Sequence, residues 1–232
     1  MEPAAAARAL VPLVERIAAG LGEALSPEQA ELLARYAVLV RTWNASVNLT
    51  AARDDGSLCE VLLADALVLR AQALIPAHAR LVDVGTGAGA PLLPLLVLRP
   101  DLRAVGVEPL HKRVAFLRTA SARLGLSTRV QVREGRIEPS ARQDARQDAP
   151  QDAPQSVPQN VEAPFDLACS RATFAPELWL RVGLALAPAV LVLTVDALPG
   201  PPPAGVTLAH ARDYVLPLSG APRRAQRYER SG

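Results

Sequence analysis

The turn that follows the first apolar strand constrains the fold more than any other segment of the chain. Residues 83–89 read Asp-Val-Gly-Thr-Gly-Ala-Gly, between an apolar strand at residues 80–84 and an apolar helix that ends near Leu98. Glycine is needed where the backbone takes a positive φ or where a ligand must approach the main chain closely. In parallel α/β sheets such turns lie at the carboxyl edge, where ligands bind. The segment therefore predicts a parallel sheet with a ligand site at this turn.

The alternation of strand and helix continues along the chain. Strands are expected at residues 103–108, 129–132, 165–169 and 189–195, with helices at 112–124 and 179–186. Short connections between such elements produce a parallel sheet covered by helices on both faces. The first 75 residues differ, because their apolar residues recur at helical spacing, in helices at 4–21, from Ser26 to Trp43, and at 57–74. We expect an α/β fold, a Rossmann-like doubly wound and mostly parallel sheet with an N-terminal helical extension.

Two units are therefore expected, a helical N-terminal cap at residues 1–75 and a Rossmann-like domain at residues 76–232. Within the second unit, residues 140–164 include repeats of Gln-Asp-Ala and carry no apolar face. A polar repeat of this kind cannot bury a core. We expect this segment to be a disordered surface insertion.

Composition excludes several classes of protein. Lys+Arg 25 against Asp+Glu 23 leaves a net charge of +2, which is too small for a basic nucleic-acid coat protein. Two cysteines cannot form a disulfide framework and show no metal-ligand spacing with the three histidines. The longest apolar run, residues 90–98, is too short to span a bilayer, and the first residues lack the basic start of a signal peptide. We expect a cytoplasmic monomer with no membrane contact and no metal.

Two cofactors are compatible with the glycine turn. Gly85, Gly87 and Ala90 satisfy the dinucleotide pattern Gly-x-Gly-x-x-Gly/Ala, whose pyrophosphate binds at a helix N-terminus. S-adenosylmethionine carries an ammonium and a sulfonium instead, and Asp83 at the end of the strand suits these cations better than it suits phosphates. Glu108, at the end of the next strand, can accept the ribose hydroxyls of either cofactor. We favour S-adenosylmethionine and keep a dinucleotide as the alternative.

Several motifs together resemble one protein family. They are Trp43-Asn-Ala-Ser-Val-Asn-Leu-Thr-Ala51, Asp65-Ala-Leu67, the glycine turn, Lys112-Arg-Val-Ala-Phe-Leu117, Phe165-Asp166, Ser170-Arg-Ala172 and Tyr214-Val-Leu-Pro217 with Gly220. On these residues the chain resembles the bacterial 16S ribosomal RNA guanine-N7 methyltransferases, also called glucose-inhibited division protein B. The resemblance implies the fold of a class I S-adenosylmethionine-dependent methyltransferase. It also implies that the substrate is 16S ribosomal RNA or the small-subunit particle.

The resemblance assigns roles to individual positions. The cofactor contacts of the family fall on Gly85, Ala90, Ile137, Glu138 and Arg171. With Asp83, Gly87 and Glu108, these residues form the expected cofactor site. Arg136 and Arg171 stand where the family places cations near the substrate base or its phosphates, and they are the expected catalytic residues.

The chemistry implied by the resemblance needs little from the protein. Guanine N7 has a lone pair and no proton at neutral pH, so its methylation requires alignment and a tolerant electrostatic site rather than a general base. Arginine matches the O6/N7 edge of guanine with two donors. We therefore expect Arg136 and Arg171 to hold the guanine edge or the phosphates.

The chain departs from the family at four places, and these departures motivate an alternative function. The glycine turn continues as Ala90-Pro91-Leu92 instead of a large apolar residue and Pro-Gly, and Leu62 replaces a family histidine. A Lys-Gly pair is missing near Val195, and the last strand, normally apolar, is rich in arginine. The alternative is a non-catalytic relative that binds RNA or a ribosome-assembly partner.

Other residues have competing interpretations. Cys169 stands where cytosine-C5 RNA methyltransferases carry a nucleophile, although a small buried hydrophobe is the commoner role of a lone cysteine. Trp43 and Trp179 are expected in the core rather than stacked on bases. Lys112 and Arg113 form either a solvated helix face or an RNA contact. The arginines of residues 223–230 form either a phosphate-binding patch or a frayed tail.

Overall fold

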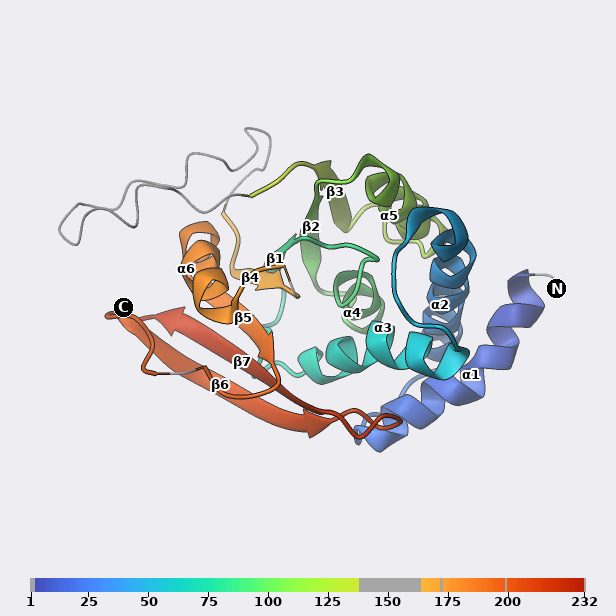
Figure 1. Ribbon diagram of the computed structural model, residues 1–232, viewed down its shortest axis with the longest axis horizontal. Coiled ribbons are helices and arrows are strands. Elements are labelled where there is room, and N and C mark those ends of the chain that lie inside the picture. The colour runs from blue at the N-terminus through green and yellow to red at the C-terminus, as the bar shows by residue number, and fades with distance from the viewer. Residues whose placement is uncertain (1–2, 138–163, 172, 199, 232) are drawn as a thin grey trace.

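A seven-stranded sheet forms the centre of the computed structural model, which describes residues 3–137, 164–171, 173–198 and 200–231 (Figure 1). The strands lie in the order β3-β2-β1-β4-β5-β7-β6. The first five are parallel, whereas β7 runs antiparallel to both β5 and β6. Their bounds are β1 (Arg80–Val84), β2 (Arg103–Glu108), β3 (Val130–Glu134), β4 (Leu167–Ser170), β5 (Ala189–Thr194), β6 (Val206–Val215) and β7 (Pro222–Arg230).

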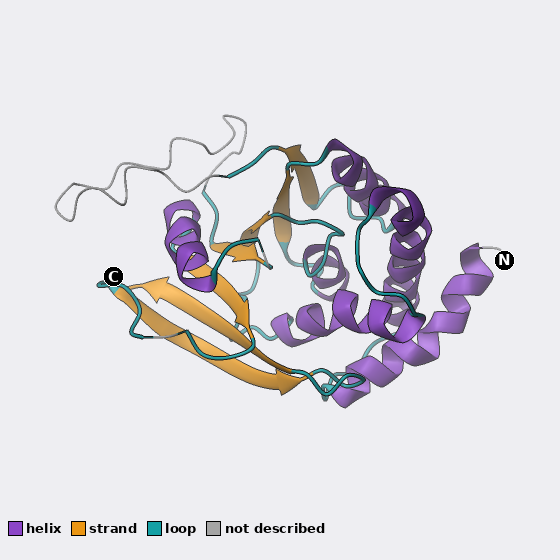
Figure 2. Ribbon diagram, in the orientation of Figure 1, coloured by secondary structure: helices purple, strands orange, loops and turns teal. Residues whose placement is uncertain are grey.

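Helices cover both faces of this sheet, as the alternating pattern predicted (Figure 2). The helices are α1 (Pro3–Gly20), α2 (Pro27–Val47), α3 (Asp55–Leu69), α4 (Leu92–Leu98), α5 (His111–Arg123) and α6 (Pro176–Leu186). Alternate residues of β1 separate the two sides, because Leu81 belongs to the hydrophobic cluster of α1–α5 and Val82 to that of α6. The period of two along a strand thus divides the core into two layers.

The helical segment before residue 75 and the sheet share one hydrophobic cluster. Buried residues of α1, α2 and α3 belong to the same cluster as Leu81 and Leu191 of the sheet. The buried hydroxyl of Tyr36 on α2 also donates a hydrogen bond of 2.8 Å to the carbonyl of Ala88 in the glycine turn. The helical segment therefore packs directly against the part of the sheet that carries the turn. Whether residues 1–75 and 76–232 fold as separate units stays a prediction.

Helix α2 begins directly after Ser26, the residue at which the sequence predicted its start. Ser26 caps the helix by accepting a hydrogen bond from the backbone N–H of Gln29, whose side chain accepts from the N–H of Ser26 in return. This reciprocal arrangement satisfies two N–H groups that the helix itself leaves without partners. The expected insertion at residues 140–164 lies almost entirely outside the described residues.

Two details of the expected elements were wrong, and one open question was decided. The third helix ends at Leu69 instead of Leu74, and the carbonyl of the next residue, Arg70, accepts a hydrogen bond from Arg99. Strand β6 was not expected, because most of its residues are exposed or half-buried and leave no clear alternation. Of the two interpretations of the arginines at 223–230, the structure excludes the frayed tail, since residues 222–230 form β7 between β5 and β6. Along β7, Ala225 and Tyr228 are buried.

Arg99 anchors the connection between α3 and β1. Its guanidinium donates to the carbonyls of Arg70, Ile75 and Pro76 and to both carboxylate oxygens of Asp101, at 2.7–3.2 Å. The contact with Arg99 also holds the pKa of Asp101 well below its usual range.

Among the helices of the described residues, none is long and apolar enough to cross a membrane.

We predict that Arg99→Ala lowers the free energy of unfolding by about 3 kcal/mol, because it removes a buried donor and leaves its acceptors without partners. Urea denaturation followed by circular dichroism measures the loss. Arg35→Ala is the control, since Arg35 pairs only with Glu31 on the exposed face of α2, and it should change the free energy by less than about 0.5 kcal/mol. Equal losses in the two variants would contradict the anchoring role.

Candidate functional site

The glycine turn after β1 is held by acceptors on the neighbouring strand β2. The backbone N–H groups of Gly85 and Thr86 both donate to the carbonyl of Val107, at 2.9 and 3.2 Å. The N–H of Gly87 donates to the carboxylate of Glu108 at 2.9 Å. The other oxygen of Glu108 accepts from the N–H of Leu110 at 3.0 Å. Glu108 therefore fixes the turn from a buried position, and it is not among the residues that line the cavities described below.

The three glycines of the turn have different reasons to be glycine. Each has a positive φ, of 73° at Gly85, 57° at Gly87 and 88° at Gly89. A Cβ on Gly85 would collide with the side chain of Thr173, and one on Gly89 with the side chain of Leu93. A Cβ on Gly87 would meet nothing closer than the carbonyl oxygen of Gly85, at 3.8 Å. Gly87 is therefore the glycine whose open side can accept a ligand.

Asp83 lies beneath the turn rather than on its surface. Its side chain is buried and faces a void of only about 10 Å³ that Cys169 also lines. Within the described residues, its Oδ2 has no hydrogen-bond partner. Burial raises the pKa of Asp83 to about 7, and the nearby Arg171 guanidinium opposes this rise. A buried carboxyl with one oxygen left unpartnered creates a negative potential when it ionises, which a cation bound above it would offset.

Three adjoining cavities surround the turn. The first, of about 470 Å³, shares Gly85 and Thr173 with the second, of about 240 Å³. The second shares Val61 and Arg171 with the third, of about 510 Å³. The cavities therefore adjoin one another in a depression that runs from the end of β2 to the end of β5. Ligands in the outer two cavities could meet near the glycine turn.

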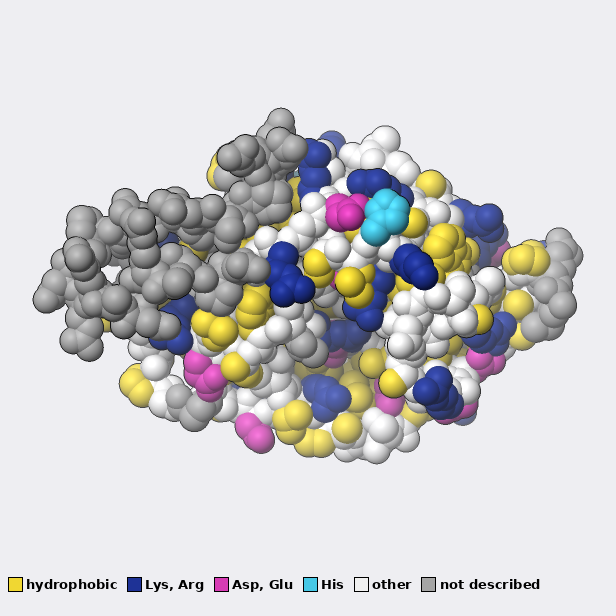
Figure 3. All heavy atoms as spheres, turned by 45° about the horizontal axis from the view of Figure 1, so that its top comes forward, with side chains coloured by type: hydrophobic (Ala, Val, Ile, Leu, Met, Phe, Trp, Pro, Cys, Tyr) yellow, Lys and Arg dark blue, Asp and Glu magenta, His cyan; other side chains and the backbone are white. Residues whose placement is uncertain are grey.

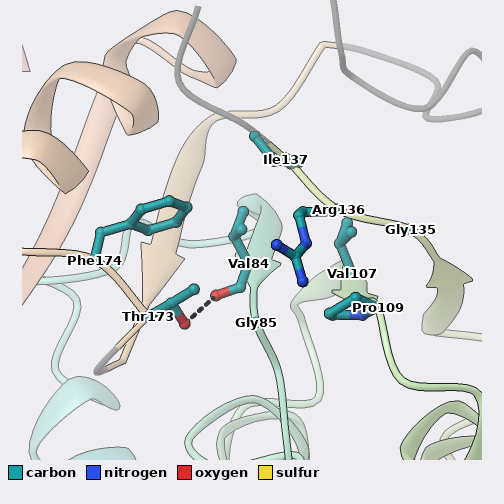
Figure 4. Close-up of a pocket in the computed structure, with 9 residues that line it drawn as sticks. All are labelled: Val84, Gly85, Val107, Pro109, Gly135, Arg136, Ile137, Thr173 and Phe174. Atoms are coloured by element: carbon teal, nitrogen blue, oxygen red, sulfur yellow. Dashed lines mark hydrogen bonds between the residues drawn. The ribbon is translucent and has the colours of Figure 1, made fainter.

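The first cavity has apolar walls and one cation (Figure 4). Val84, Val107, Ile137 and Phe174 supply the apolar surface. The exposed side chain of Arg136 points into the cavity, as Figure 4 shows. These features suit a flat, largely apolar group with polar edges.

The aromatic wall of this cavity is held from behind. The ring of Phe174 stacks on that of Trp179, with centroids 5.9 Å apart. Trp179 is itself buried and donates from Nε1 to the carbonyl of Leu191 at 2.7 Å. The core role expected for Trp179 is thus confirmed. Trp43 is half-buried and meets Phe116 edge to face at 5.6 Å, which places it in the core as well.

The second cavity lies over the glycine turn and is closed by the loop that follows α2. Asn44 folds this loop, because its Oδ1 accepts from the N–H groups of Leu49 and Thr50 at 2.7 and 2.8 Å. Leu49 and Thr50 line the cavity, as does Arg113, which donates to the carbonyl of Asn48 at 3.0 Å. The Trp-Asn…Asn-Leu-Thr motif thus shapes a wall of the site.

Arg171 lies between the second and third cavities. Its Nη1 donates to Oδ2 of Asp65 at 3.0 Å and to the carbonyl of Val61 at 2.6 Å. Asp65 accepts a further hydrogen bond of 2.6 Å from the hydroxyl of Tyr214. The third cavity combines apolar residues such as Leu193 with the charged groups Asp65, Glu60, Arg171 and Arg223.

The structure places the residues expected from the sequence in different parts of this site. Arg136 and Ile137 line the first cavity, Gly85 the first and second, Gly87 and Ala90 the second, and Arg171 the second and third. Asp83 and Glu108 lie under the turn, and Glu138 lies outside the described residues. Arg136 and Arg171, expected to act together, line different cavities.

Several lining residues were missed in the sequence. Thr173 and Phe174 follow the Ser-Arg-Ala motif, and Val61 projects from a helix expected only as part of a cap. No periodicity marks these positions. Their nearness to motif residues is the signal that could have found them.

Cys169 does not have the properties of a nucleophile. It is buried in strand β4, and burial raises the pKa of its thiol well above the ordinary value. The thiolate that would attack a substrate is therefore disfavoured. The small-hydrophobe interpretation fits this environment.

In the described part of the chain, no group of three or more His, Cys, Asp or Glu side chains could hold a metal ion.

Basic side chains surround the depression, and they are not equally available. Figure 3 shows Lys and Arg side chains spread among apolar ones on this face. Lys112 and Arg136 are exposed. Along β7, by contrast, Arg224 pairs with Asp213, Arg227 with Glu229, and Arg230 donates to the carbonyl of Leu184. Of the arginines on β7, Arg223 is the one that lines a cavity.

The start of α4 is poorly suited to a pyrophosphate. Pro91 has no N–H, and the N–H of Leu93 donates to the carbonyl of Gly89 at 2.7 Å. A dinucleotide needs free N–H groups at this helix N-terminus. The geometry therefore weighs against the dinucleotide alternative.

Comparison with known sequences identifies relatives. A family model described as rRNA small subunit methyltransferase G matches residues 29–177 of the 232. The protein of that name from Moorella thermoacetica is 40% identical over 122 residues, which are 53% of this chain and 50% of that protein. The one from Methylobacillus flagellatus is 36% identical over 162 residues, which are 70% of this chain and 68% of that protein. The chain spans about half the length of several other curated relatives it matches.

Comparison with solved structures confirms the class I methyltransferase architecture. An O-methyltransferase from Bacillus cereus, solved in complex with SAH, superposes with a TM-score of 0.54 at 19% identity, over 84% of this chain and 90% of that one. The O-methyltransferase TomG from Streptomyces achromogenes, solved in complex with SAM, gives a TM-score of 0.52 at 18% identity, over 87% and 90%. The fold expected from the sequence is confirmed, and because the family model spans well over half of its length, the chain belongs to the rRNA small subunit methyltransferase G family.

Proposed function

We propose that the protein is an S-adenosylmethionine-dependent methyltransferase that modifies N7 of a guanine in 16S ribosomal RNA. The observation that supports this proposal is that the second and third cavities adjoin at Arg171, because a cofactor over the glycine turn would then lie next to a base in the third cavity. We further propose that it acts in the cytoplasm, where ribosomal RNA is located, and that it acts as a monomer.

The residues around the turn fit S-adenosylmethionine. The apolar walls of the first cavity, Val84, Val107, Ile137 and Phe174, would hold its adenine. Gly87 leaves room for the close approach of its amino-acid end to the main chain. The unpartnered Oδ2 of Asp83 favours a cationic ligand above it. When bound, this cofactor supplies a methyl group activated on a cationic sulfur.

The third cavity is the proposed place of the guanine. Its apolar side chains, among them Leu193 and Leu216, can cover the faces of a purine. The attacking lone pair of N7 must stay unoccupied, so an arginine donor cannot bind that nitrogen during the reaction. We therefore propose that Arg171 donates to O6 alone, which revises the two-point contact expected from the sequence. Arg136, which lines the first cavity, would instead contact the cofactor or a phosphate.

The departures from the family leave the turn intact. Although the turn continues as Ala90-Pro91-Leu92, Gly85 and Gly87 keep their positive φ and Ala90 lines the second cavity. The arginine-rich last strand forms a regular part of the sheet. No geometric observation favours the non-catalytic alternative, and the assays below distinguish the two functions.

We predict that Gly87→Ala raises the Kd for S-adenosylmethionine at least about tenfold, because a Cβ would occupy the open side of the turn. Isothermal titration calorimetry measures the affinity. Gly125→Ala is a matched control, since Gly125 has a similar φ of 70° and equally open surroundings after α5. Each substitution should cost about 1 kcal/mol of stability through its strained φ. Unchanged affinity in Gly87→Ala would remove this glycine from the site.

We predict that the affinity for S-adenosylmethionine rises severalfold between pH 5.5 and 7.5, because Asp83, with a pKa of about 7, ionises over this interval and attracts a cation. Titration calorimetry across this range tests the slope. Asp83→Asn should abolish this pH dependence of the affinity, whereas the surface variant Glu31→Gln should keep it.

The same carboxyl favours its protonated form in the folded protein, so the free energy of unfolding falls as the pH rises from about 4 to about 7. Asp83→Asn should also remove this loss, and a variant that keeps both slopes would contradict the role.

We predict that the protein transfers methyl groups to 16S ribosomal RNA taken from cells that lack this gene. Mass spectrometry of nuclease digests should show N7-methylguanosine after incubation with S-adenosylmethionine. Arg171→Ala should lower the rate at least about tenfold through loss of a contact made to the base. Arg224→Ala on β7 should transfer normally. Tight binding of S-adenosylmethionine without any methylated guanosine would favour the non-catalytic alternative.

A further inference from the structure

Arg171 needs support from its surroundings if it is to act at a defined place. An arginine side chain has several rotatable bonds, and fixing it costs about 2 kcal/mol of conformational entropy. Arg171 follows β4, at the border between the second and third cavities. In the described part of the chain, its hydrogen bonds are made by Nη1 alone. Nε and Nη2 therefore remain available to donate to a ligand.

Two acceptors on α3 hold Nη1. Oδ2 of Asp65 lies 3.0 Å away and the carbonyl of Val61 lies 2.6 Å away. Asp65 and Val61 are one helical turn apart, so they face the same side of α3. The Asp65 side chain is only 11% exposed and that of Arg171 is 26% exposed. A charge-assisted pair with so little water around it is stronger and more directional than a surface ion pair.

Asp65 is held in turn by Tyr214, from the opposite end of the chain. The hydroxyl of Tyr214 on β6 donates to Oδ1 of Asp65 at 2.6 Å. Tyr214 is buried, and burial together with the neighbouring Asp65 charge raises the pKa of its hydroxyl above the ordinary value. The hydroxyl therefore stays protonated at neutral pH and donates to Asp65. Among the residues that the structure describes, each oxygen of Asp65 has one partner, and the carboxylate cannot rotate without breaking both contacts.

We propose that Asp65 and Tyr214 are positioning residues that hold the Arg171 guanidinium at the border between the cofactor and base cavities. This inference rests on the proposed function. The two hydrogen bonds, from Tyr214 to Asp65 and from Arg171 to Asp65, join β6, α3 and the end of β4. It gives the helical N-terminal segment and the antiparallel hairpin a shared role in the site.

The charge of Asp65 adds a second effect. When a methyl group moves from sulfur to N7, the carbon–sulfur bond breaks as the carbon–nitrogen bond forms, and the positive charge moves to the guanine. The Arg171 guanidinium alone would oppose a cation at this place. The Asp65 carboxylate, 3.0 Å from Nη1, offsets this repulsion. Asp65 thus allows an arginine to contact the base without penalising the charged product.

The test compares Asp65→Asn and Tyr214→Phe with matched controls. Glu23→Gln is the control for Asp65, since Glu23 is also a carboxylate paired with arginines, Arg70 and Arg212. Tyr228→Phe is the control for Tyr214, since Tyr228 is also buried, with its hydroxyl bonded to Gln226. Three quantities are measured for each protein: the Kd for S-adenosylmethionine, kcat and KM with 16S ribosomal RNA, and the nuclear magnetic resonance signal of the Arg171 guanidinium.

We predict that Asp65→Asn lowers kcat about tenfold to a hundredfold, and Tyr214→Phe about threefold to tenfold, with the Kd and KM within about threefold of wild type. The Arg171 guanidinium should rotate faster in both variants and should be unchanged in the two controls. In an Arg171→Ala background, Asp65→Asn should change kcat by less than about twofold, because residues that act through one group are not additive.

Three results would overturn the positioning role. One is an unchanged Arg171 signal in Asp65→Asn and Tyr214→Phe. Another is a loss of kcat caused by Asp65→Asn that persists in full without Arg171. The third is equal losses in the controls. If Asp65→Asn does not fold, Tyr214→Phe carries the same test. A wild-type protein that transfers no methyl group would refute the proposed function, and the Arg171 signal would still decide the positioning.

Discussion

The site depends on hydrogen bonds between the glycine turn and the end of β2. The carbonyl of Val107 and the carboxylate of Glu108 accept three backbone N–H groups of the turn, and these bonds determine where the glycines lie. Because Glu108 is buried, its contact with Gly87 is stronger than it would be in water. The first two cavities have Gly85 in common. A displaced turn would change both at once.

The helical N-terminal segment contributes walls to the site as well as a cover for the sheet. Tyr36 fixes the carbonyl of Ala88 from behind the turn, and Asn44 folds the loop that closes the second cavity. Asp65 on α3 holds Arg171. These contacts explain why family motifs occur before the first strand of the sheet. The N-terminal helices share their hydrophobic cluster with the sheet, so packing places each of these side chains at a defined depth.

Most of the fold could be predicted from the sequence, because its signals are local. The period of two in β1 and the capping box at Ser26 depend on residues within a few positions of each other. Strand β6 gave no such signal, since an edge strand exposed on much of both faces has no regular pattern. For the arginines of β7, composition could not decide between a patch and a tail. The structure excludes the tail, because these residues form a strand of the sheet. Three of the arginines are also paired, with Asp213, Glu229 and the carbonyl of Leu184.

The residues of the candidate site also divide into those that the sequence could predict and those that only the structure could place. The sequence by itself determined that a ligand-binding turn follows the first strand and that Gly85, Gly87 and Arg171 belong near it, because glycine spacing and short motifs are read along the chain. Only the tertiary structure decided that Asp83 lies under the turn, that Arg136 and Arg171 line different cavities, and that Asp65 and Tyr214 meet. Asp65 is separated from Arg171 by 106 positions and from Tyr214 by 149. Contacts over such separations depend on how helices and strands pack, and no local pattern in the chain records that packing.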